Sequence, residues 1–163
     1  MVNTSANTNT AIWPILETVM DPEVPVLSVL DLGVIRAVTV DDKQVTVTIT
    51  PTYTGCPAMD MIAMQIRMAL MAAGYEPIIK TILSPAWTTD WMTEKGKQQL
   101  KAYGIAPPVG KSIDAAYLED LVVPCPQCQS THTVLVSQFG STACKALFKC
   151  EECKEPFDYF KCH

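Results

Sequence analysis

The chain has 163 residues, of which 48% are apolar and 18% are charged, and its formal net charge is −5. This composition excludes wholesale disorder, and the acidic balance gives no electrostatic footprint for nucleic acid or acidic lipid. No apolar run approaches the roughly 20 residues of a membrane span. We therefore expect a cytoplasmic protein, built as one domain or as one domain plus a small module, that binds neither nucleic acid nor membrane.

The start of the chain is polar and then becomes helical. Residues 1–10 are rich in Thr, Asn and Ser, so we expect them to be disordered. Between Ile12 and Val19 the apolar residues recur on one helical face, which predicts a short helix. The Asp21-Pro22-Glu23 turn then ends that helix, because the residue before a proline disfavours the helical conformation.

Three strands and one long helix are predicted next. Residues 34–40 and 44–50 are strand-like on either side of a turn at 41–43, which is the pattern of a β-hairpin. Residues 57–73 carry apolar side chains at helical spacing, and residues 76–83 are again strand-like. A helix between two strands is the crossover that joins parallel strands of one sheet, so the sequence predicts a small α/β domain.

A loop with two tryptophans follows the third strand. We expect Trp91 to lie in the core and Trp87 to lie at the rim of the preceding loop that contains the first cysteine. Thr89 and Asp90 are both good N-caps, so a further helix is predicted from there to Tyr103. The first domain is then expected to end at a proline pair.

The domain organisation follows from a change in composition near residue 124. We expect an α/β domain at residues 11–108, a linker at 109–123 and a second module at 124–163. The second module holds six of the seven cysteines.

Four of those cysteines form two Cys-x-x-Cys knuckles separated by 21 residues: Cys125, Cys128, Cys150 and Cys153. At this separation four thiolates can surround one ion tetrahedrally. Short strand-like stretches lie between the knuckles, which is the layout of a zinc ribbon. We expect a structural zinc ion, with iron in a rubredoxin-like site as the alternative.

Two cysteines and two histidines remain in the tail: Cys144, Cys162, His132 and His163. Neither histidine has the spacing of a knuckle ligand, so we expect both to have a surface or core role.

Cys56 is the second candidate site. Gly55 lets the chain turn before it, and Pro57 suits the first position of the following helix. At a helix N-terminus the peptide dipoles and the free backbone N–H groups favour a thiolate. The alternative is a small buried apolar residue, since cysteine is often buried. A nucleophile is disfavoured, because both histidines that could act as its base lie in the tail.

The predicted helix at 57–73 is apolar nearly all round. One stripe consists of Met59, Ile62, Ile66 and Leu70, and a second stripe consists of Met61, Met64, Met68 and Met71. A deep core helix and a methionine-rich surface for a partner protein both fit this pattern.

Seven further motifs are spread from residue 21 to residue 162. They are Asp21-Pro-Glu-Val-Pro25, Val29-Leu-Asp-Leu-Gly33, Pro51-Thr-Tyr-Thr-Gly-Cys-Pro57, Pro85-Ala-Trp-Thr-Thr-Asp-Trp91, Gly104-Ile-Ala-Pro-Pro108, Phe139-Gly-Ser-Thr-Ala-Cys-Lys145 and Glu155-Pro-Phe-Asp-Tyr-Phe-Lys-Cys162. With the two knuckles they resemble a family of phenylacetate-degradation proteins, the D subunits of the phenylacetyl-CoA epoxidase. The first domain alone resembles the broader iron–sulfur assembly family, which shares the Asp-Pro-Glu turn and a cysteine before a helix.

The resemblance implies an accessory protein of a multicomponent monooxygenase that epoxidises the ring of phenylacetyl-CoA in phenylacetate catabolism. The sequence has no Glu-x-x-His pairs for a di-iron site, no dinucleotide fingerprint and no ferredoxin cysteine run. We therefore expect the oxygenation chemistry to belong to other subunits, and this chain to be no enzyme but an assembly or repair factor for the iron–sulfur cluster or the di-iron site.

On this hypothesis Cys56 receives or passes iron or a cluster, with Asp21, Glu23 and Thr54 as neighbouring groups. Asp21 and Glu23 fit a helix-stopping turn equally well. One cysteine cannot hold a cluster, which usually needs four thiolates, so a homodimer or a partner protein is required. The expected partners are the oxygenase and reductase subunits. The alternative is a structural docking subunit in which Cys56 is incidental.

Overall fold

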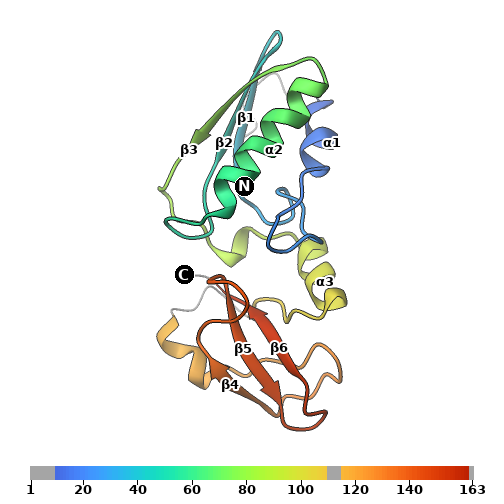
Figure 1. The fold of residues 1–163 in the computed structure, drawn as a ribbon, viewed down its shortest axis with the longest axis vertical. Coiled ribbons are helices and arrows are strands. Elements are labelled where there is room, and N and C mark those ends of the chain that lie inside the picture. The colour runs from blue at the N-terminus through green and yellow to red at the C-terminus, as the bar shows by residue number, and fades with distance from the viewer. Residues whose placement is uncertain (1–9, 110–114, 162–163) are drawn as a thin grey trace. The chain divides into compact units, whose positions relative to one another are not determined.

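The computed structural model describes residues 10–109 and 115–161 (Figure 1). The expectations for residues 1–9, for residues 110–114 of the linker, and for Cys162 and His163 lie outside these ranges. Within the described ranges the chain forms two compact units, which meet in sequence between Thr93 and Glu94, with Thr88–Asp90 assigned to the second unit. The domain end at residue 108 stays a prediction.

The first unit contains a three-stranded sheet in the order β1-β2-β3, with α2 lying across it (Figure 1). Strands β1 and β2 are antiparallel, and β2 and β3 are parallel. The predicted hairpin, crossover helix and third strand are thereby confirmed. The elements are α1 (Ile12–Glu17), β1 (Ile35–Asp41), β2 (Gln44–Ile49), α2 (Ala58–Ala72) and β3 (Glu76–Thr81).

Alternation along β2 explains how the sheet acquires a core face. Val45, Val47 and Ile49 are fully buried, whereas the residues between them are only partly buried. Successive side chains of a strand point to opposite faces, so the three apolar residues share one face. The hairpin register aligns Asp41 with Gln44 around a tight turn, in which Asp42 has a positive φ of 53°.

The end of α2 sets the start of β3. Gly74 has a φ of +87°, its N–H donates to the carbonyl of Met71 (2.9 Å), and the Tyr75 N–H donates to the carbonyl of Leu70 (3.0 Å). These two bonds form a Schellman motif, which needs a residue that tolerates the left-handed conformation. The chain therefore reverses at Gly74 and enters β3 beside β2.

The loop after β3 differs from the predicted helix start. Thr89–Trp91 form a short 3₁₀ turn, and α3 (Glu94–Tyr103) begins only at Glu94, so the start predicted at Thr89 or Asp90 is wrong. The reason is Thr93, whose N–H donates to the carbonyl of Asp31 (2.9 Å) and whose hydroxyl donates to the Asp31 carboxylate (2.6 Å). These bonds fix the chain before α3.

The burial of the two tryptophans is the reverse of what the sequence predicts. Trp87 is buried, and its indole N–H donates to the carbonyl of Leu32 (3.0 Å). Trp91 is only half-buried, with the Arg36 guanidinium 3.5 Å from its ring centroid. A buried indole needs a hydrogen-bond acceptor, which the Leu32 carbonyl supplies, so Trp87 is the core residue.

The second unit is built around a three-stranded antiparallel sheet in the order β4-β5-β6. Its core stacks Phe148 on Phe157, with ring centroids 6.0 Å apart, and sets Tyr159 edge-on to Phe148 at 5.6 Å. The elements of the second unit after α3 are the 3₁₀ segment Ala115–Asp120, β4 (Thr133–Ser137), β5 (Lys145–Cys150) and β6 (Pro156–Phe160).

Among the described helices none is long and apolar enough to cross a membrane.

Candidate functional site

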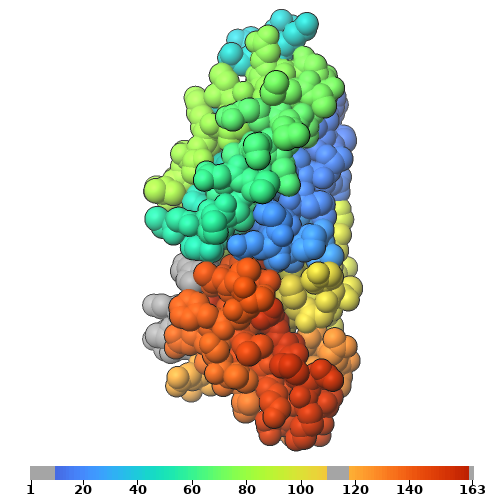
Figure 2. Space-filling model, in the orientation of Figure 1, coloured from blue at the N-terminus to red at the C-terminus, as the bar shows by residue number. Residues whose placement is uncertain are grey.

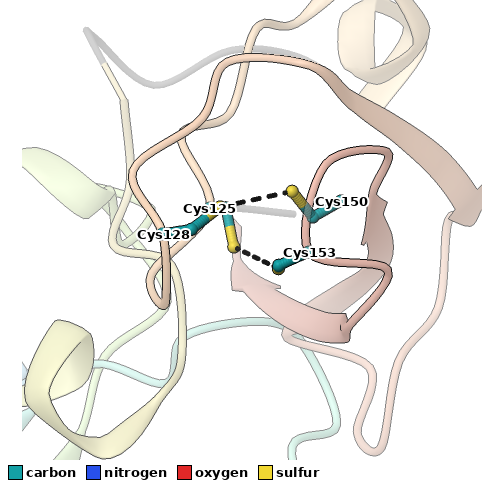
Figure 3. Close-up of side chains that lie close together, drawn as sticks. All are labelled: Cys125, Cys128, Cys150 and Cys153. Carbon is teal, nitrogen blue, oxygen red and sulfur yellow. Dashed lines mark hydrogen bonds between the residues drawn. The ribbon is translucent and has the colours of Figure 1, made fainter.

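The four knuckle cysteines converge within the second unit (Figure 3). Their sulfur atoms all lie within 4.8 Å of one another. The Sγ atoms of Cys125 and Cys153 are 3.7 Å apart, and those of Cys128 and Cys150 are 3.5 Å apart. Chain segments more than twenty residues apart in sequence thus present four soft ligands to one point.

These distances fit a single tetrahedral ion. Four sulfur atoms at about 2.3 Å from a zinc ion would lie about 3.8 Å from one another. The two separations of 3.5 and 3.7 Å are close to that value, and the remaining pairs lie within 4.8 Å, so the four thiols are close enough to bind one ion together. An all-thiolate donor set suits zinc or iron and disfavours magnesium or calcium, which prefer oxygen ligands.

Both knuckles have the same backbone geometry. The N–H of Cys125 donates to the carbonyl of Ser130 (2.9 Å), and the N–H of Cys150 donates to the carbonyl of Glu155 (3.0 Å), five residues ahead in each case. The residue after the second cysteine has a positive φ in both, 64° at Gln129 and 67° at Lys154. A left-handed residue lets the chain fold back over the pair, which aims both sulfur atoms inward.

Two of the four thiols, Cys150 and Cys153, have pKa values shifted in opposite directions. The backbone N–H of Cys153 and then that of Glu152 lower the pKa of Cys150 to about 7, against the effect of burial. The backbone N–H of Glu155 lowers the pKa of Cys153, but burial and the neighbouring thiols outweigh it and raise the value to about 12. A bound cation would replace the protons that keep such neighbours neutral, so metal binding releases protons here.

His132 and Cys144, the described members of the remaining tail residues, take no part in this cluster. His132 is exposed, and its Nδ1 lies 2.7 Å from a carboxylate oxygen of Glu152. Cys144 is buried, with its sulfur 3.0 Å from the Thr142 hydroxyl. Cys162 and His163 lie outside the described residues.

Cys56 lies on the loop between β2 and α2. Its side chain is half-buried, its carbonyl accepts from the N–H of Met59 (3.2 Å), and Thr52 donates its hydroxyl to the sulfur at 3.9 Å. Pro57 is the N-cap of α2, one position before the first helical residue. The loop tip at Thr54 and Gly55 is exposed, and nothing lies within 4 Å of a Cβ built at Gly55. A partner protein could therefore reach the Cys56 region from the Thr54 side.

The Asp21 carboxylate supports its own turn. Its Oδ1 accepts from the N–H groups of Glu23 (2.7 Å) and Val24 (2.8 Å), and the residue is buried. Among the described residues, the four tail cysteines alone form a group of three or more potential ligands within 4.8 Å. Asp21, Glu23 and Cys56 are thus not brought together as a ready-made metal site.

Sequence reasoning overlooked a polar cluster around the motif at residues 139–145. Lys145 and Lys161 are both buried. The Lys145 ammonium donates to the Ser141 hydroxyl (2.8 Å) and lies 4.0 Å from Asp158, while that of Lys161 lies 4.5 Å from the centroid of the Phe139 ring. Burial lowers the pKa of Lys161, and the nearby Cys144 opposes that shift. A lysine next to the apolar strand β6 was the available signal.

Two families match different parts of the chain. The family described as iron-sulfur cluster assembly protein matches residues 9–74, and the family described as PaaD zinc beta ribbon domain matches residues 111–161. An Escherichia coli (strain K12) protein, named as the D subunit of 1,2-phenylacetyl-CoA epoxidase, is 49% identical over 152 residues, which are 93% of this chain and 91% of that protein. The chain belongs to the family of phenylacetyl-CoA epoxidase D subunits.

Other relatives of this D-subunit family member cover less of the chain. A Porphyromonas gingivalis (strain ATCC BAA-308 / W83) protein named Fe-S protein maturation auxiliary factor is 40% identical over 103 residues, 61% of this chain and 97% of that factor. The crystal structure of a domain of unknown function, DUF59, from Bacillus anthracis has 26% sequence identity and a TM-score of 0.52, and covers 56% of this chain and 89% of that one. The predicted α/β domain with a zinc ribbon is confirmed by these matches.

Proposed function

We propose that this chain is a non-catalytic accessory protein of the phenylacetyl-CoA epoxidase. In this role it assists the assembly or repair of the iron–sulfur cluster or of the di-iron site of that enzyme system, and Cys56 is the residue that handles the metal. The partners are the oxygenase and reductase subunits, which receive the metal and carry out the oxygenation.

The observation that carries the proposal is the pair of relatives. One relative is an epoxidase subunit matched over nearly its whole length, and the other is a maturation factor of which 97% is covered by 103 residues of this chain. A factor of that length corresponds to one domain of this chain. Maturation of iron–sulfur proteins is therefore the activity that the shared domain supports best.

The geometry around Cys56 is consistent with handover. The thiol is half-buried on a loop whose tip at Thr54 and Gly55 is exposed, and the Thr52 hydroxyl lies 3.9 Å from its sulfur. A single thiolate supplies one ligand, whereas a cluster usually takes four. The missing ligands must come from the client protein or from a second copy. Cys56 therefore holds iron or a cluster only while that partner is bound. Asp21 and Glu23 would contribute oxygen ligands only if binding of a client moved their carboxylates toward Cys56.

We further infer that Cys125, Cys128, Cys150 and Cys153 hold a structural zinc ion. Bound zinc supplies a closed, redox-inactive cross-link between the two knuckles. Four thiolates would fill all coordination positions of the ion, so no position would be left open for water or substrate. Elemental analysis of the purified protein tests this directly, with one zinc and no iron per chain as the expected result.

Substitution of Cys56 tests the assembly role. The oxygenase and reductase are purified from cells that carry the wild-type chain, Cys56→Ser or no chain. We expect Cys56→Ser to lower their iron content and epoxidase activity toward the level without the chain. Cys144→Ser serves as the matched cysteine control, because Cys144 lies in the second unit outside the metal cluster. Full iron and normal activity with Cys56→Ser would overturn the proposal.

A docking protein without metal chemistry is the second candidate. The observation that favours it is the outer face of α2, where the second methionine stripe is exposed to solvent. The same experiment separates the two candidates, because a docking protein would tolerate Cys56→Ser but not the loss of the whole chain.

A further inference from the structure

Four methionines form an exposed face on α2. Met61, Met64, Met68 and Met71 are 45%, 50%, 62% and 59% exposed. The opposite stripe of the same helix, at Ile62, Ile66 and Leu70, is buried. In Figure 2 the green surface of α2 faces the viewer next to the blue surface of α1. A contiguous patch of exposed apolar side chains often marks an interaction site, whereas single exposed apolar residues are common on any protein surface.

The spacing of the methionines indicates the shape of the partner. They follow one another at three, four and three residues, which is the a/d repeat of a coiled-coil seam. Such a seam accepts the side chains of another helix between its own. Methionine is flexible and polarisable, so its surface adapts to helices of different sequence. A helix therefore fits this face better than a strand or a flat surface.

A pocket adjoins the methionine face, and Gln65 is one of its lining residues. It has a volume of about 350 Å³ and is lined by Thr18, Val19, Met20, Gln65, Met68 and Ala69. The Oε1 atom of Gln65 is buried and has no hydrogen-bond partner among the described residues. A buried acceptor without a partner is costly, so a donor that Oε1 meets when the Gln65 side chain turns toward the pocket would be favoured.

Charges complete the pattern of the face. At about 100° per residue, Asp60 and Arg67 lie on one flank of the methionines and Gln65 lies on the other flank. A partner helix with a basic residue opposite Asp60 and an acidic residue opposite Arg67 would bind in only one orientation along α2. The face thus specifies both an apolar stripe and the orientation of its partner.

A second copy of the chain fits this face poorly. The 15-residue helix is about 22 Å long and about 10 Å wide, roughly 220 Å² of footprint, well below the about 800 Å² per partner of a stable interface, so this face alone holds any partner only weakly. An antiparallel pairing that matched all four methionines would also set Arg67 against its own copy. The face suits a brief contact with another protein.

We propose that the methionine face of α2 and the adjoining pocket bind an amphipathic helix of a client subunit, with a side-chain N–H of that helix donating to Oε1 of Gln65. The helix carries apolar residues at three- and four-residue spacing, and its N–H-bearing side chain enters the pocket beside Met68. The identity of the client as the oxygenase or reductase subunit rests on the proposed function.

Site-specific photo-crosslinking tests the proposal. p-Benzoylphenylalanine replaces Met64 in the full chain, which is co-expressed with the oxygenase and reductase subunits, and cross-linked peptides are sequenced by mass spectrometry. We expect cross-links to one helical segment with the stated apolar spacing. The same label at Thr39, an exposed position on β1, is the control and should give none. Cross-links to a second copy, to a non-helical segment or to nothing at all would each overturn the proposal.

Binding measurements then test the two parts of the face. The subunit identified by cross-linking is purified, and its affinity for variants of this chain is measured. Met68→Glu should weaken binding by about tenfold or more, on the scale of an interface hot spot. Thr39→Glu should leave the affinity unchanged. Gln65→Met removes the unpartnered acceptor, so it should keep or raise the melting temperature and still weaken binding by roughly threefold to tenfold. Unchanged or tighter binding by Gln65→Met would refute the hydrogen bond.

Cys56→Ser keeps this inference distinct from the proposed function. If helix docking precedes metal handover, Cys56→Ser retains full binding while client iron content falls. If Cys56→Ser leaves iron content normal but Met68→Glu abolishes binding, the metal-handling proposal fails and the docking proposal stands. If Met68→Glu binds like wild type, the docking proposal fails whatever the iron content shows.

Discussion

The first unit buries a mainly aliphatic core that includes Trp87, whereas the second unit includes Cys125 and Cys150 among its buried core residues. In the first unit the sheet residues of β2 and the inner stripe of α2 exclude water, and Cys56 is left on a loop. In the second unit two ligand cysteines lie against Phe148 and its neighbours. The proposed metal site therefore shares two of its four cysteines, Cys125 and Cys150, with the core of the second unit.

The proposed function assigns permanent metal binding to the second unit and transient metal binding to the first. Four convergent thiols at the knuckles offer a closed shell, and a small sheet needs the cross-link for stability. A single thiol on a loop offers one ligand, and its unit is stabilised without it. A cysteine that its domain does not need for folding is free to exchange a metal with a partner. Experiments that remove each source of stability in turn test this contrast.

The largest effect is expected from removing a knuckle ligand. Cys150→Ser should abolish zinc binding and unfold the second unit, because structural zinc contributes on the order of 10 kcal/mol to the folding of small metal-bound modules. Hydrogen exchange should show loss of protection in β5 and β6, with β2 and α2 still protected. Cys56→Ser in the same assay should change neither unit. Loss of protection in both units at once would contradict the proposed independence of the first core.

An intermediate effect is expected from the two faces of α2. Leu70→Ala empties a fully buried site and should destabilise the first unit by about 2–5 kcal/mol, while Met68→Ala should change stability by no more than about 0.5 kcal/mol. Urea denaturation, followed by tryptophan fluorescence, measures the free energy of unfolding of both variants. Comparable losses for the two variants would show that the methionine face is packed in solution and not free for a partner.

The smallest effect concerns alkaline pH and the second unit. Burial raises the pKa of Tyr159, against the N–H of Val109, which donates to its hydroxyl oxygen. A folded-state pKa above the unfolded value of about 10 gives stability that is present below pH 10 and is lost as the pH rises through the folded value. Tyr159→Phe should remove that slope, at most about 1.4 kcal/mol per pH unit. Denaturation curves at pH 9 and pH 11 measure it. The same slope in Tyr159→Phe would assign it to another group.

Much of the fold follows from local sequence patterns. Alternation in residues 44–50 predicts a strand with one buried face, and the helical spacing in residues 57–73 predicts α2, because period and burial are linked within a single element. Gly74 marks the helix end, since only a residue that tolerates positive φ closes the Schellman motif cheaply. The four knuckle cysteines were identified because metal ligands in short Cys-x-x-Cys pairs need no tertiary information to be recognised.

Contacts between distant residues decided what the sequence could not. Helix α3 begins at Glu94 and not at Thr89 or Asp90, because Thr93 donates a hydrogen bond to Asp31, which lies 62 residues earlier. The indole of Trp87 is buried because the Leu32 carbonyl, 55 residues away, accepts its N–H. Both bonds join residues far apart in the chain, so no local window contains both partners. Asp21 shows the opposite case, because its turn is local and the sequence already allowed it.

The sequence by itself determined that four cysteines would meet and that Cys56 would precede a helix, because both follow from short-range spacing. Only the tertiary structure decided which methionines of α2 face solvent. An apolar stripe on each side of a helix looks the same in sequence, and the choice between them depends on where the sheet lies. The sheet covers the stripe at Ile62, Ile66 and Leu70, and it leaves the second methionine stripe exposed on the outer face.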